Sequence, residues 1–308
     1  MRILITGGAG FIGSHLAGHF QGRAAVRVLD NLRTGHRQNL AGLDVEFIEG
    51  SVTDLAVVER AVAAVDYVFH LAALTSVAES MGKLRECAEV NVSGHINILK
   101  AAAAAGVRKL VFASSAAVYG DHPASPKVET MFPEPKTPYA ITKLDGEHYN
   151  AMFTREGWLE TASIRLFNVF GPRQDPKGAY AAVIPVFIER AMRGEPLPLF
   201  GDGGQTRDFI YVKDIVSALA FAAETQGLAG VFNAGYGMQT TIAALAGKII
   251  EQTGSSSRID YRPVRDGDVR HSTACADKLR AAGWKPVHSF DEGLSATLRE
   301  WRGVRTGT

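Results

Sequence analysis

A tyrosine and a lysine stand four residues apart in this sequence, at Tyr139 and Lys143. Thr137 and Pro138, just before them, have the residue types of a helix N-cap and a first helical residue, so both side chains are expected on one helical face. A free tyrosine has a pKa of about 10, and a neighbouring ammonium lowers it by favouring the phenolate. The spacing therefore predicts a tyrosine that accepts and returns a proton.

Two serines, Ser114 and Ser115, follow an apolar run of strand length at 110–113. Doubly wound sheets bind their ligands at the carboxyl ends of the strands. We expect the Ser115 hydroxyl to bond the reacting oxygen of a substrate. Ser114 either caps the turn or lines the neighbouring cofactor site.

Three glycines, Gly7, Gly10 and Gly13, lie between an apolar run at 3–5 and a segment of helical periodicity. Glycine permits the tight turn and lets the backbone approach a pyrophosphate, whose charge is stabilised by the N–H groups and dipole of the helix start. A strand, a glycine turn and a helix in this order predict a dinucleotide site.

Asp30 ends the second predicted strand, twenty residues after Gly10. A carboxylate at that position accepts hydrogen bonds from the adenosine ribose hydroxyls and repels a 2′-phosphate. Arg33 favours NADP, because a basic side chain attracts that phosphate, but Asp30 holds the strand-end position. We therefore expect NAD as the cofactor.

The elements that must position these residues alternate between strand and helix. Apolar runs of strand length lie at 3–5, 26–29, 45–48, 67–71, 110–113 and 162–167, and helical periodicity lies at 15–21, 56–64, 90–105 and 140–153. Continuous apolar strands separated by helices predict a parallel sheet that is covered on both faces. The expected fold class is α/β, a Rossmann-type doubly wound parallel sheet.

From Asn168 onward, glycine and proline punctuate shorter elements, which predicts a smaller, interleaved C-terminal α/β lobe. Strand-like runs at 209–212 and 231–234 flank a helical stretch at 215–224, which is expected to return to the first sheet. We assign 1–167 to an NAD-binding domain, with 206–236 returning to it, and 168–205 and 237–308 to a substrate-binding lobe.

The amino-acid composition limits the binding partners and the cellular location to be expected. The 33 Lys and Arg residues against 32 Asp and Glu leave a net charge of +1, which provides no field for binding nucleic acid or an anionic membrane. Cys87 and Cys275 lack the spacing of a zinc site or a disulfide framework, so a cytoplasmic location is expected. His15 and His19 have metal-ligand spacing without a third ligand, and we expect no metal. No run reaches the roughly 18 apolar residues of a membrane helix, so the chain is expected to be neither secreted nor membrane-spanning.

Several motifs in order resemble the extended short-chain dehydrogenase/reductase superfamily: GGAGFIG at 7–13, DNLRTG at 30–35, HLAA at 70–73, Asn91, SSAAVYG at 114–120 and YAITK at 139–143. Further segments resemble the nucleotide-sugar 4-epimerases of that superfamily: LFNVFGPRQDPKGAYAAVIP at 166–185, GDGGQTRDFIYVKD at 201–214 and RDGDV at 265–269. The likeness spans nearly the whole chain.

The resemblance implies an NAD that is reduced and reoxidised within one turnover. Tyr139 would take the proton of the sugar 4-hydroxyl while hydride leaves C4, and the 4-keto sugar would rotate and receive hydride on its other face. Ser115 would bind the 4-oxygen. Lys143 would hold the nicotinamide ribose, and Asn91 would support the region around Lys143.

The resemblance also implies two sets of binding residues. The cofactor set is Gly7, Gly10, Phe11, Ile12, Gly13, Asp30, Asn31, Gly35, Ser51, Val52, Leu71, Ala72, Ala73, Asn91, Ser114, Tyr139 and Lys143. The substrate set is Ser115, Tyr139, Asn168, Val183, Arg207, Arg265, Asp268 and Ser272. In the family, residues matching Asn168 and the two arginines hold UDP, and one matching Asp268 holds the uridine ribose.

Some positions depart from the family pattern. Ser51 replaces an aspartate that commonly contacts adenine, although Ser51 and Val52 still fit a cofactor pocket. Ala116 and Ala117 stand where related dehydratases have acidic residues that eliminate water from C5 and C6. The two alanines argue against dehydration, and they weaken a related decarboxylase reaction in the same way.

The small side chain of Ser272 stands where narrow-specificity UDP-glucose 4-epimerases carry a bulky tyrosine. It leaves room for a 2-acetamido group, so we expect UDP-GlcNAc, interconverted with UDP-GalNAc, with UDP-Glc and UDP-Gal as further substrates. UDP-glucuronate stays open, with Arg173 as a candidate donor to its carboxylate. The resemblance also leaves open a nucleotide-sugar dehydratase or reductase and, less in keeping with the catalytic residues, an NAD-binding regulatory protein without turnover.

The helix expected at 90–105 and the one beginning at Tyr139 form a four-helix dimer interface in the superfamily. The resemblance therefore implies a homodimer.

Overall fold

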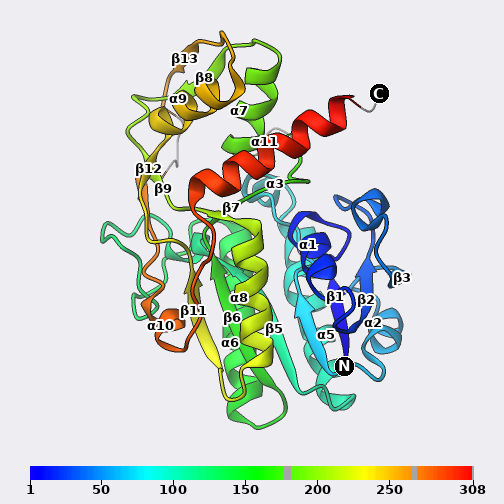
Figure 1. Cartoon of the computed structure of the whole chain (residues 1–308). Coiled ribbons are helices and arrows are strands. Elements are labelled where there is room, and N and C mark those ends of the chain that lie inside the picture. Colours follow the sequence, from blue (N-terminus) through cyan, green and yellow to red (C-terminus); the bar gives the residue numbers. More distant parts are fainter. Residues whose placement is uncertain (177–181, 265–268, 307–308) are drawn as a thin grey trace.

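The computed structural model describes residues 1–176, 182–264 and 269–306, and a parallel sheet of seven strands organises them (Figure 1). Its strands in chain order are β1 (Arg2–Thr6), β2 (Ala25–Asp30), β3 (Val45–Glu49), β4 (Tyr67–His70), β5 (Lys109–Ser115), β6 (Glu160–Leu166) and β11 (Gly230–Ala234). Across the sheet they run β11-β6-β5-β4-β1-β2-β3, each parallel to its neighbour. This confirms the predicted doubly wound fold, in which the chain starts in the middle of the sheet.

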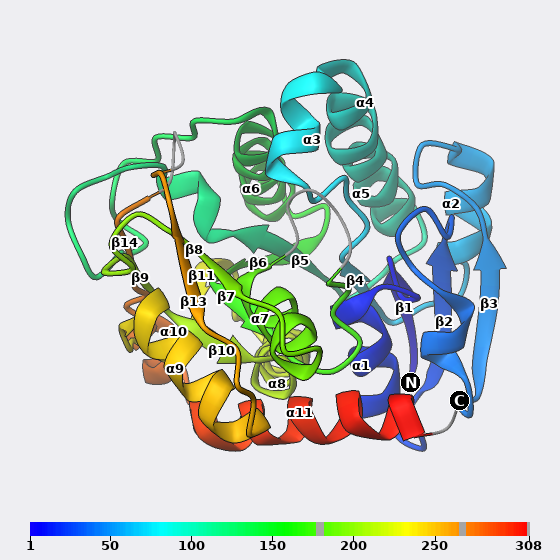
Figure 2. The ribbon, with the colours of Figure 1, turned by 90° about the horizontal axis from the view of Figure 1, so that it is seen from above.

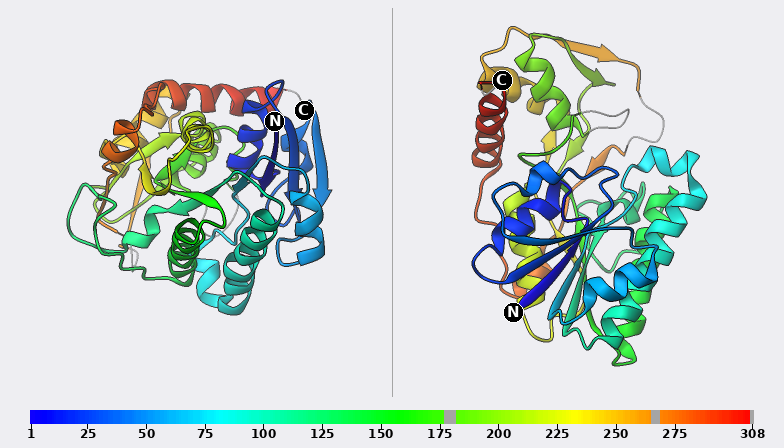
Figure 3. Two further views of the ribbon diagram at one scale, coloured as in Figure 1. Left: turned by 90° about the horizontal axis from the view of Figure 1, so that it is seen from below. Right: turned by 90° about the vertical axis from the view of Figure 1, so that its right-hand side faces the viewer.

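Helices cover both faces of this sheet, as Figure 2 and the left view of Figure 3 show. One layer contains α2 (Leu55–Val62), α3 (Val77–Gly82), α4 (Leu84–Ala88), α5 (Gly94–Ala104) and α6 (Pro138–Arg155). The other contains α1 (Phe11–His19), α8 (Val212–Glu224) and α11 (Phe290–Thr306). Because both faces are covered, Ile3, Leu4 and Ile5 of the central strand β1 have no exposed surface.

The helix expected at 90–105 begins earlier, because it continues from α4 without a break and contains a π-helical turn. A π-helical turn, η2 (Glu89–Ser93), precedes α5 and carries Asn91. Such turns insert an extra residue into a helix and often occur at functional sites.

The second half of the chain contributes α8 and β11 to the large sheet. The strand β11 pairs with β6, and α8 packs against α1, so that Ile215 and Leu219 share one buried core with Leu16. The returning segment was expected to begin at residue 206, but in the structure it begins at Val212. The difference arises because β9 (Thr206–Arg207) pairs with β12 (Thr240–Thr241) and β14 (His271–Ser272), while β10 (Phe209–Tyr211) pairs with β7 (Asn168–Phe170).

The remaining elements form a smaller lobe next to the large sheet, clearest in the right view of Figure 3. Its elements are α7 (Val183–Met192), β8 (Leu197–Phe200), α9 (Ile242–Thr253) and β13 (Ile259–Arg262), with the short α10 (Asp277–Ala281) beside β11. The strands β8 and β13 pair in parallel. The helix α11 packs against β10 and runs above the upper ends of α8 and α1 (Figure 1).

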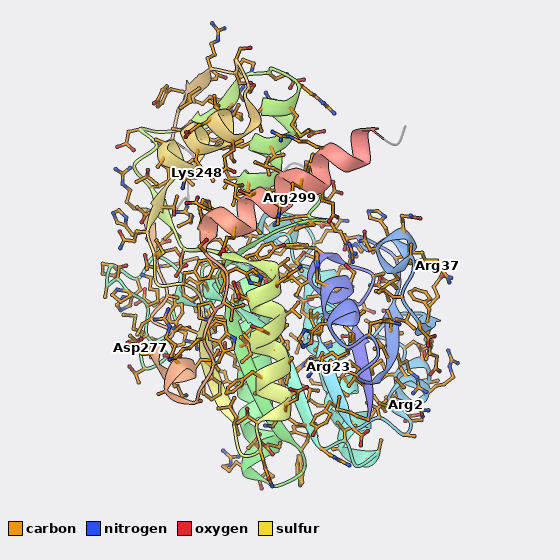
Figure 4. The ribbon with its side chains drawn as sticks, in the orientation of Figure 1. Arg2, Arg23, Arg37, Lys248, Asp277 and Arg299 are labelled. Carbon is orange, nitrogen blue, oxygen red and sulfur yellow. The ribbon has the colours of Figure 1, made fainter. Side chains whose placement is uncertain are left out.

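Many charged side chains lie at the surface, among them Arg23, Arg37 and Asp277, which Figure 4 labels. Many are paired, as Arg23 is with Glu224 at 2.9 Å. Within the described residues, no helix combines the length and the apolar character needed to cross a membrane.

Candidate active site

The three predicted catalytic residues come from two neighbouring elements. Ser115 ends β5, and Tyr139 and Lys143 lie near the start of α6. The Lys143 ammonium donates to the Ala113 carbonyl at 2.7 Å and lies 5.8 Å from the centre of the Tyr139 ring. The hydroxyl of Ser115 accepts the Ala117 N–H at 3.1 Å and also bonds the Tyr139 side chain. The serine, the tyrosine and the lysine are therefore brought together.

The ionisation of the pair differs from the sequence-based expectation. Burial raises the pKa of Tyr139, and the hydrogen bond with Ser115 offsets only part of this rise. Burial lowers the pKa of Lys143 to about 8. In the protein without NAD the loss of water around the phenol disfavours the phenolate, and the predicted lowering stays a prediction for the enzyme with NAD bound, whose positively charged nicotinamide also favours the phenolate.

Local hydrogen bonds fix the start of α6. The Thr137 hydroxyl accepts the Ala140 N–H at 3.3 Å, which confirms the predicted cap, and Pro138 occupies the first turn. The Tyr139 N–H donates to the Ser80 hydroxyl of α3 at 3.3 Å. The catalytic tyrosine is thus held by its own helix cap and by a neighbouring helix.

Asn91 joins the loop after β4 to the start of α6 through hydrogen bonds of its side chain. Its side-chain oxygen accepts the Leu74 N–H at 2.7 Å, and its amide donates to the Leu74 carbonyl at 3.1 Å and to the Thr142 hydroxyl at 3.0 Å. The support predicted for the region around Lys143 therefore exists. Its polar atoms are used within the protein and it does not line the cleft, so its predicted contact with the cofactor stays a prediction.

A cleft of about 670 Å³ opens at the carboxyl end of the large sheet. The predicted cofactor residues that line it are Gly7, Gly10, Phe11, Ile12, Gly13, Asp30, Asn31, Gly35, Ser51, Val52, Leu71, Ala72, Ala73, Ser114, Tyr139 and Lys143. These are all of the predicted set except Asn91.

The glycines leave the space that a dinucleotide needs. A Cβ atom added at Gly7, whose φ is +70°, would lie 2.8 Å from the Ala72 nitrogen, and one added at Gly13 would lie 2.3 Å from the Gly7 oxygen. The turn therefore admits no side chain at these positions, and its backbone faces the cleft at the start of α1. This cradle fits the pyrophosphate of NAD.

Asp30 lies where the adenosine half of the cofactor is expected. Its carboxylate accepts the N–H groups of Ala9 at 2.9 Å and Leu32 at 2.8 Å, which joins the glycine turn to the loop after β2. A carboxylate has four lone-pair sites, so acceptors remain for ribose hydroxyls. Ser51 also lines the cleft, and its hydroxyl bonds Thr53 at 2.8 Å.

A second pocket of about 350 Å³ adjoins the first. Ser115 and Asn168 line both, and Arg207 and Ser272 from the small lobe line the second. Asn168 is fixed by its N–H, which donates to the Asp208 carbonyl at 3.1 Å. Ser115 therefore stands where a substrate in the second pocket meets a cofactor in the first.

Other predicted substrate residues are placed differently. Val183 begins α7 and does not line either pocket. Arg265 and Asp268 lie outside the described residues. Arg173 lines the cofactor cleft, where it donates to the Asn39 carbonyl at 3.0 Å, and its contact with a sugar carboxylate stays an open alternative.

Sequence reasoning missed a buried ion pair beside the catalytic residues. Glu147 accepts two bonds from Arg165, at 2.9 and 2.7 Å, and one from the Ser114 hydroxyl at 2.5 Å. The sequence signal that could have identified Glu147 was its position four residues after Lys143 on the same helix. The pair anchors α6 to β6 and to the end of β5.

Among the described residues, no cluster of three His, Cys, Asp or Glu side chains is arranged to hold a metal ion. His15 instead bonds the Pro172 carbonyl at 2.9 Å, and burial lowers its pKa to about 4.

Comparison with known proteins gives a consistent result. The chain is 37% identical to a UDP-glucose 4-epimerase of Mycolicibacterium smegmatis, over 98% of this chain and 99% of that one. Its structure resembles a UDP-N-acetylglucosamine 4-epimerase from Methanobrevibacter ruminantium in complex with UDP-N-acetylmuramic acid, with a TM-score of 0.95, 36% identity and 98% of both chains covered. It also resembles a Thermus thermophilus UDP-glucose 4-epimerase in complex with NAD, with a TM-score of 0.90, 39% identity and 98% and 99% of the two chains covered.

The fold and the site define an NAD-dependent enzyme of the extended short-chain dehydrogenase/reductase superfamily. The chain belongs to the NAD dependent epimerase/dehydratase family, whose sequence model matches residues 3–235. With relatives that are 4-epimerases, it is an NAD-dependent isomerase.

Proposed function

We propose that this isomerase interconverts UDP-GlcNAc and UDP-GalNAc by inverting carbon 4, and that it also accepts UDP-Glc and UDP-Gal. The observation that carries the proposal is the position of Ser115 where the cofactor cleft meets the second pocket, with Tyr139 bonded to it and Lys143 beside them in the cleft. Bound NAD supplies reversible oxidation of the sugar at C4.

The side chains then have distinct tasks. The Tyr139 oxygen takes and returns the proton of the 4-hydroxyl, and the Ser115 hydroxyl bonds the same substrate oxygen. Lys143 holds the cofactor ribose, and its positive charge favours the phenolate. The positive charge of a bound nicotinamide acts in the same direction, against the burial that raises the pKa of Tyr139 in the protein alone.

The residues around Ser115 favour epimerisation over dehydration. Ala116 and Ala117 line the second pocket, at the positions where elimination of water needs acidic groups. Neither side chain can donate or accept a proton.

The substrate assignment rests on Ser272. This small side chain lines the second pocket together with Arg207 and Asn168, which suit the diphosphate and the nucleotide. Space beside Ser272 suits a 2-acetamido group.

A proton NMR time course with UDP-GlcNAc and no added NAD tests the reaction. We expect a UDP-GalNAc signal to grow to a fixed ratio, because the cofactor is regenerated in each turnover. Tyr139→Phe should slow the reaction about a thousandfold, and Tyr149→Phe on the same helix serves as the control. Full turnover by Tyr139→Phe would refute the assigned chemistry.

A larger side chain at residue 272 tests the substrate assignment. Ser272→Tyr should lower kcat/KM for UDP-GlcNAc about a hundredfold and leave UDP-Glc much less affected, because the added ring fills the space of the acetamido group. Equal losses with both sugars, or a wild-type enzyme that turns over UDP-Glc or UDP-glucuronate only, would contradict the assignment.

We also propose a homodimer in the cytoplasm. Ile141 on α6, Met81 on α3 and Leu84 on α4 are 46%, 64% and 63% exposed, an apolar surface suited to a second copy. The thiols of Cys87 and Cys275 are unpaired, which suits a reducing compartment. A monomeric mass by light scattering would contradict the dimer.

A further inference from the structure

Arg33 lines the cofactor cleft from the loop that follows β2. Its N–H donates to the side-chain oxygen of Asn31 at 3.2 Å, which sets the turn next to Asp30. An arginine at this place in a Rossmann fold is positioned to bind the 2′-phosphate of NADP. Arg33 therefore favours the binding of NADP, although this enzyme is NAD-dependent.

Two carboxylates occupy this guanidinium. Nη2 of Arg33 donates to Glu79 at 2.6 Å, and Nη1 donates to Glu86. Glu79 lies on α3 and Glu86 on α4, so both partners come from the helical segment after β4. Lys83 also bonds Glu79, at 2.8 Å.

A phosphate would compete with these carboxylates for the same guanidinium. Guanidinium binds phosphate through two parallel N–H groups, and in this structure each terminal nitrogen of Arg33 already has a carboxylate acceptor. The side chains of Arg33, Glu79 and Glu86 are 30%, 33% and 43% exposed, so solvent screens the pairs only in part.

The other arginines near the cleft are not placed to take this role. Arg37 pairs with Glu49 at 3.0 Å, covers the Phe47 ring and lies at the outer edge of the molecule (Figure 4). Arg173 bonds the Asn39 carbonyl. Arg33 is therefore the cation on which discrimination between NAD and NADP depends.

We propose that Glu79 and Glu86 are specificity residues that select NAD over NADP by occupying the guanidinium of Arg33. Asp30 repels a 2′-phosphate directly, and the two glutamates remove the cation that would otherwise attract it. Selection against NADP thus depends on helices α3 and α4, about fifty residues away along the chain from Arg33.

The affinities of the cofactor-free protein for NAD⁺ and NADP⁺, measured by calorimetry, test the proposal independently of any sugar. In Glu79→Gln/Glu86→Gln we expect the ratio of NADP⁺ to NAD⁺ affinity to rise about tenfold, because Arg33 is freed for the phosphate. The control is Glu189→Gln/Glu224→Gln, which changes net charge equally at the ion-paired surface residues bonded to Arg193 and Arg23.

Arg33→Ala, alone and combined with the two glutamate substitutions, gives the remaining variants of a mutant cycle. Added to the double glutamate variant, it should abolish the gain in NADP⁺ affinity, whereas in the wild type it should change the ratio little. The single variants Glu79→Gln and Glu86→Gln repeat the measurement if the double variant does not fold. An unchanged ratio, an equal gain in the control, or a gain that survives Arg33→Ala would overturn the proposal.

Discussion

At the scale of single residues, Lys143 is present in the site although burial of its ammonium lowers the stability of the fold. It is 3% exposed, its hydrogen bond goes to the Ala113 carbonyl, and burial lowers its pKa to about 8. A buried ammonium without a carboxylate bonded to it is unfavourable. The roles proposed for Lys143, holding the cofactor ribose and favouring the Tyr139 phenolate, account for its retention.

Lys143→Met should therefore stabilise the cofactor-free protein at pH 7 by about 2 kcal/mol while it abolishes turnover. The folded pKa lies below the unfolded value, so the wild type carries the full penalty below pH 8 and loses it as the pH rises toward the unfolded pKa. The stability difference between variant and wild type should shrink over that range. Urea denaturation at several pH values measures it.

The matched control is Lys109→Met. Lys109 is equally buried, but its ammonium bonds Glu160 at 2.7 Å and two carbonyls, so this variant should be destabilised. Destabilisation of Lys143→Met at pH 7 would show that the contacts of Lys143 outweigh its burial.

At the scale of elements, α6 carries the proposed catalytic pair, and its start is the part most fully encoded by local sequence. Thr137, Pro138 and the spacing of Tyr139 and Lys143 were sufficient to predict the cap and the shared face. The bond from Tyr139 to Ser80 and the pair of Glu147 with Arg165 join residues distant in the chain, so no local pattern indicated these partners, although helical spacing placed Glu147 beside Lys143.

Thr137→Ala should lower the free energy of unfolding by about 1 kcal/mol and also reduce kcat several-fold, because the lost cap loosens the turn that holds Tyr139. Thr241→Ala removes an equivalent cap, on Ala244 at the start of α9, and should cost similar stability without affecting kcat. Thermal denaturation and steady-state rates well below the melting temperature separate the two effects. Equal rates for the two variants would contradict a catalytic role for the cap.

At the scale of the whole molecule, the two halves of the chain share one sheet and one core. The strand β11 covers the edge of β6, and α8 packs against α1 and β5. Removing them would expose Phe232 and Leu219, which are 4% and 0% exposed in the whole protein.

A fragment of residues 1–167 should therefore fail to fold cooperatively, although it contains the whole predicted glycine turn and catalytic helix. Circular dichroism should record one sharp thermal transition for the full chain and a broad or absent one for the fragment. A fragment with a sharp transition and NAD affinity would contradict this account.

The sequence by itself determined the chemistry of the site and the order of strands and helices, because the glycine turn, Asp30, Ser115 and the tyrosine–lysine pair depend on short-range spacing and hydrophobic period. Only the tertiary structure decided the hydrogen-bond partners of Asn91, the position of Arg173 on the cofactor cleft, and the start of the returning segment at Val212. These depend on which distant segments become neighbours. Such pairings are stabilised by burial and long-range hydrogen bonds, which leave no periodic pattern in the sequence.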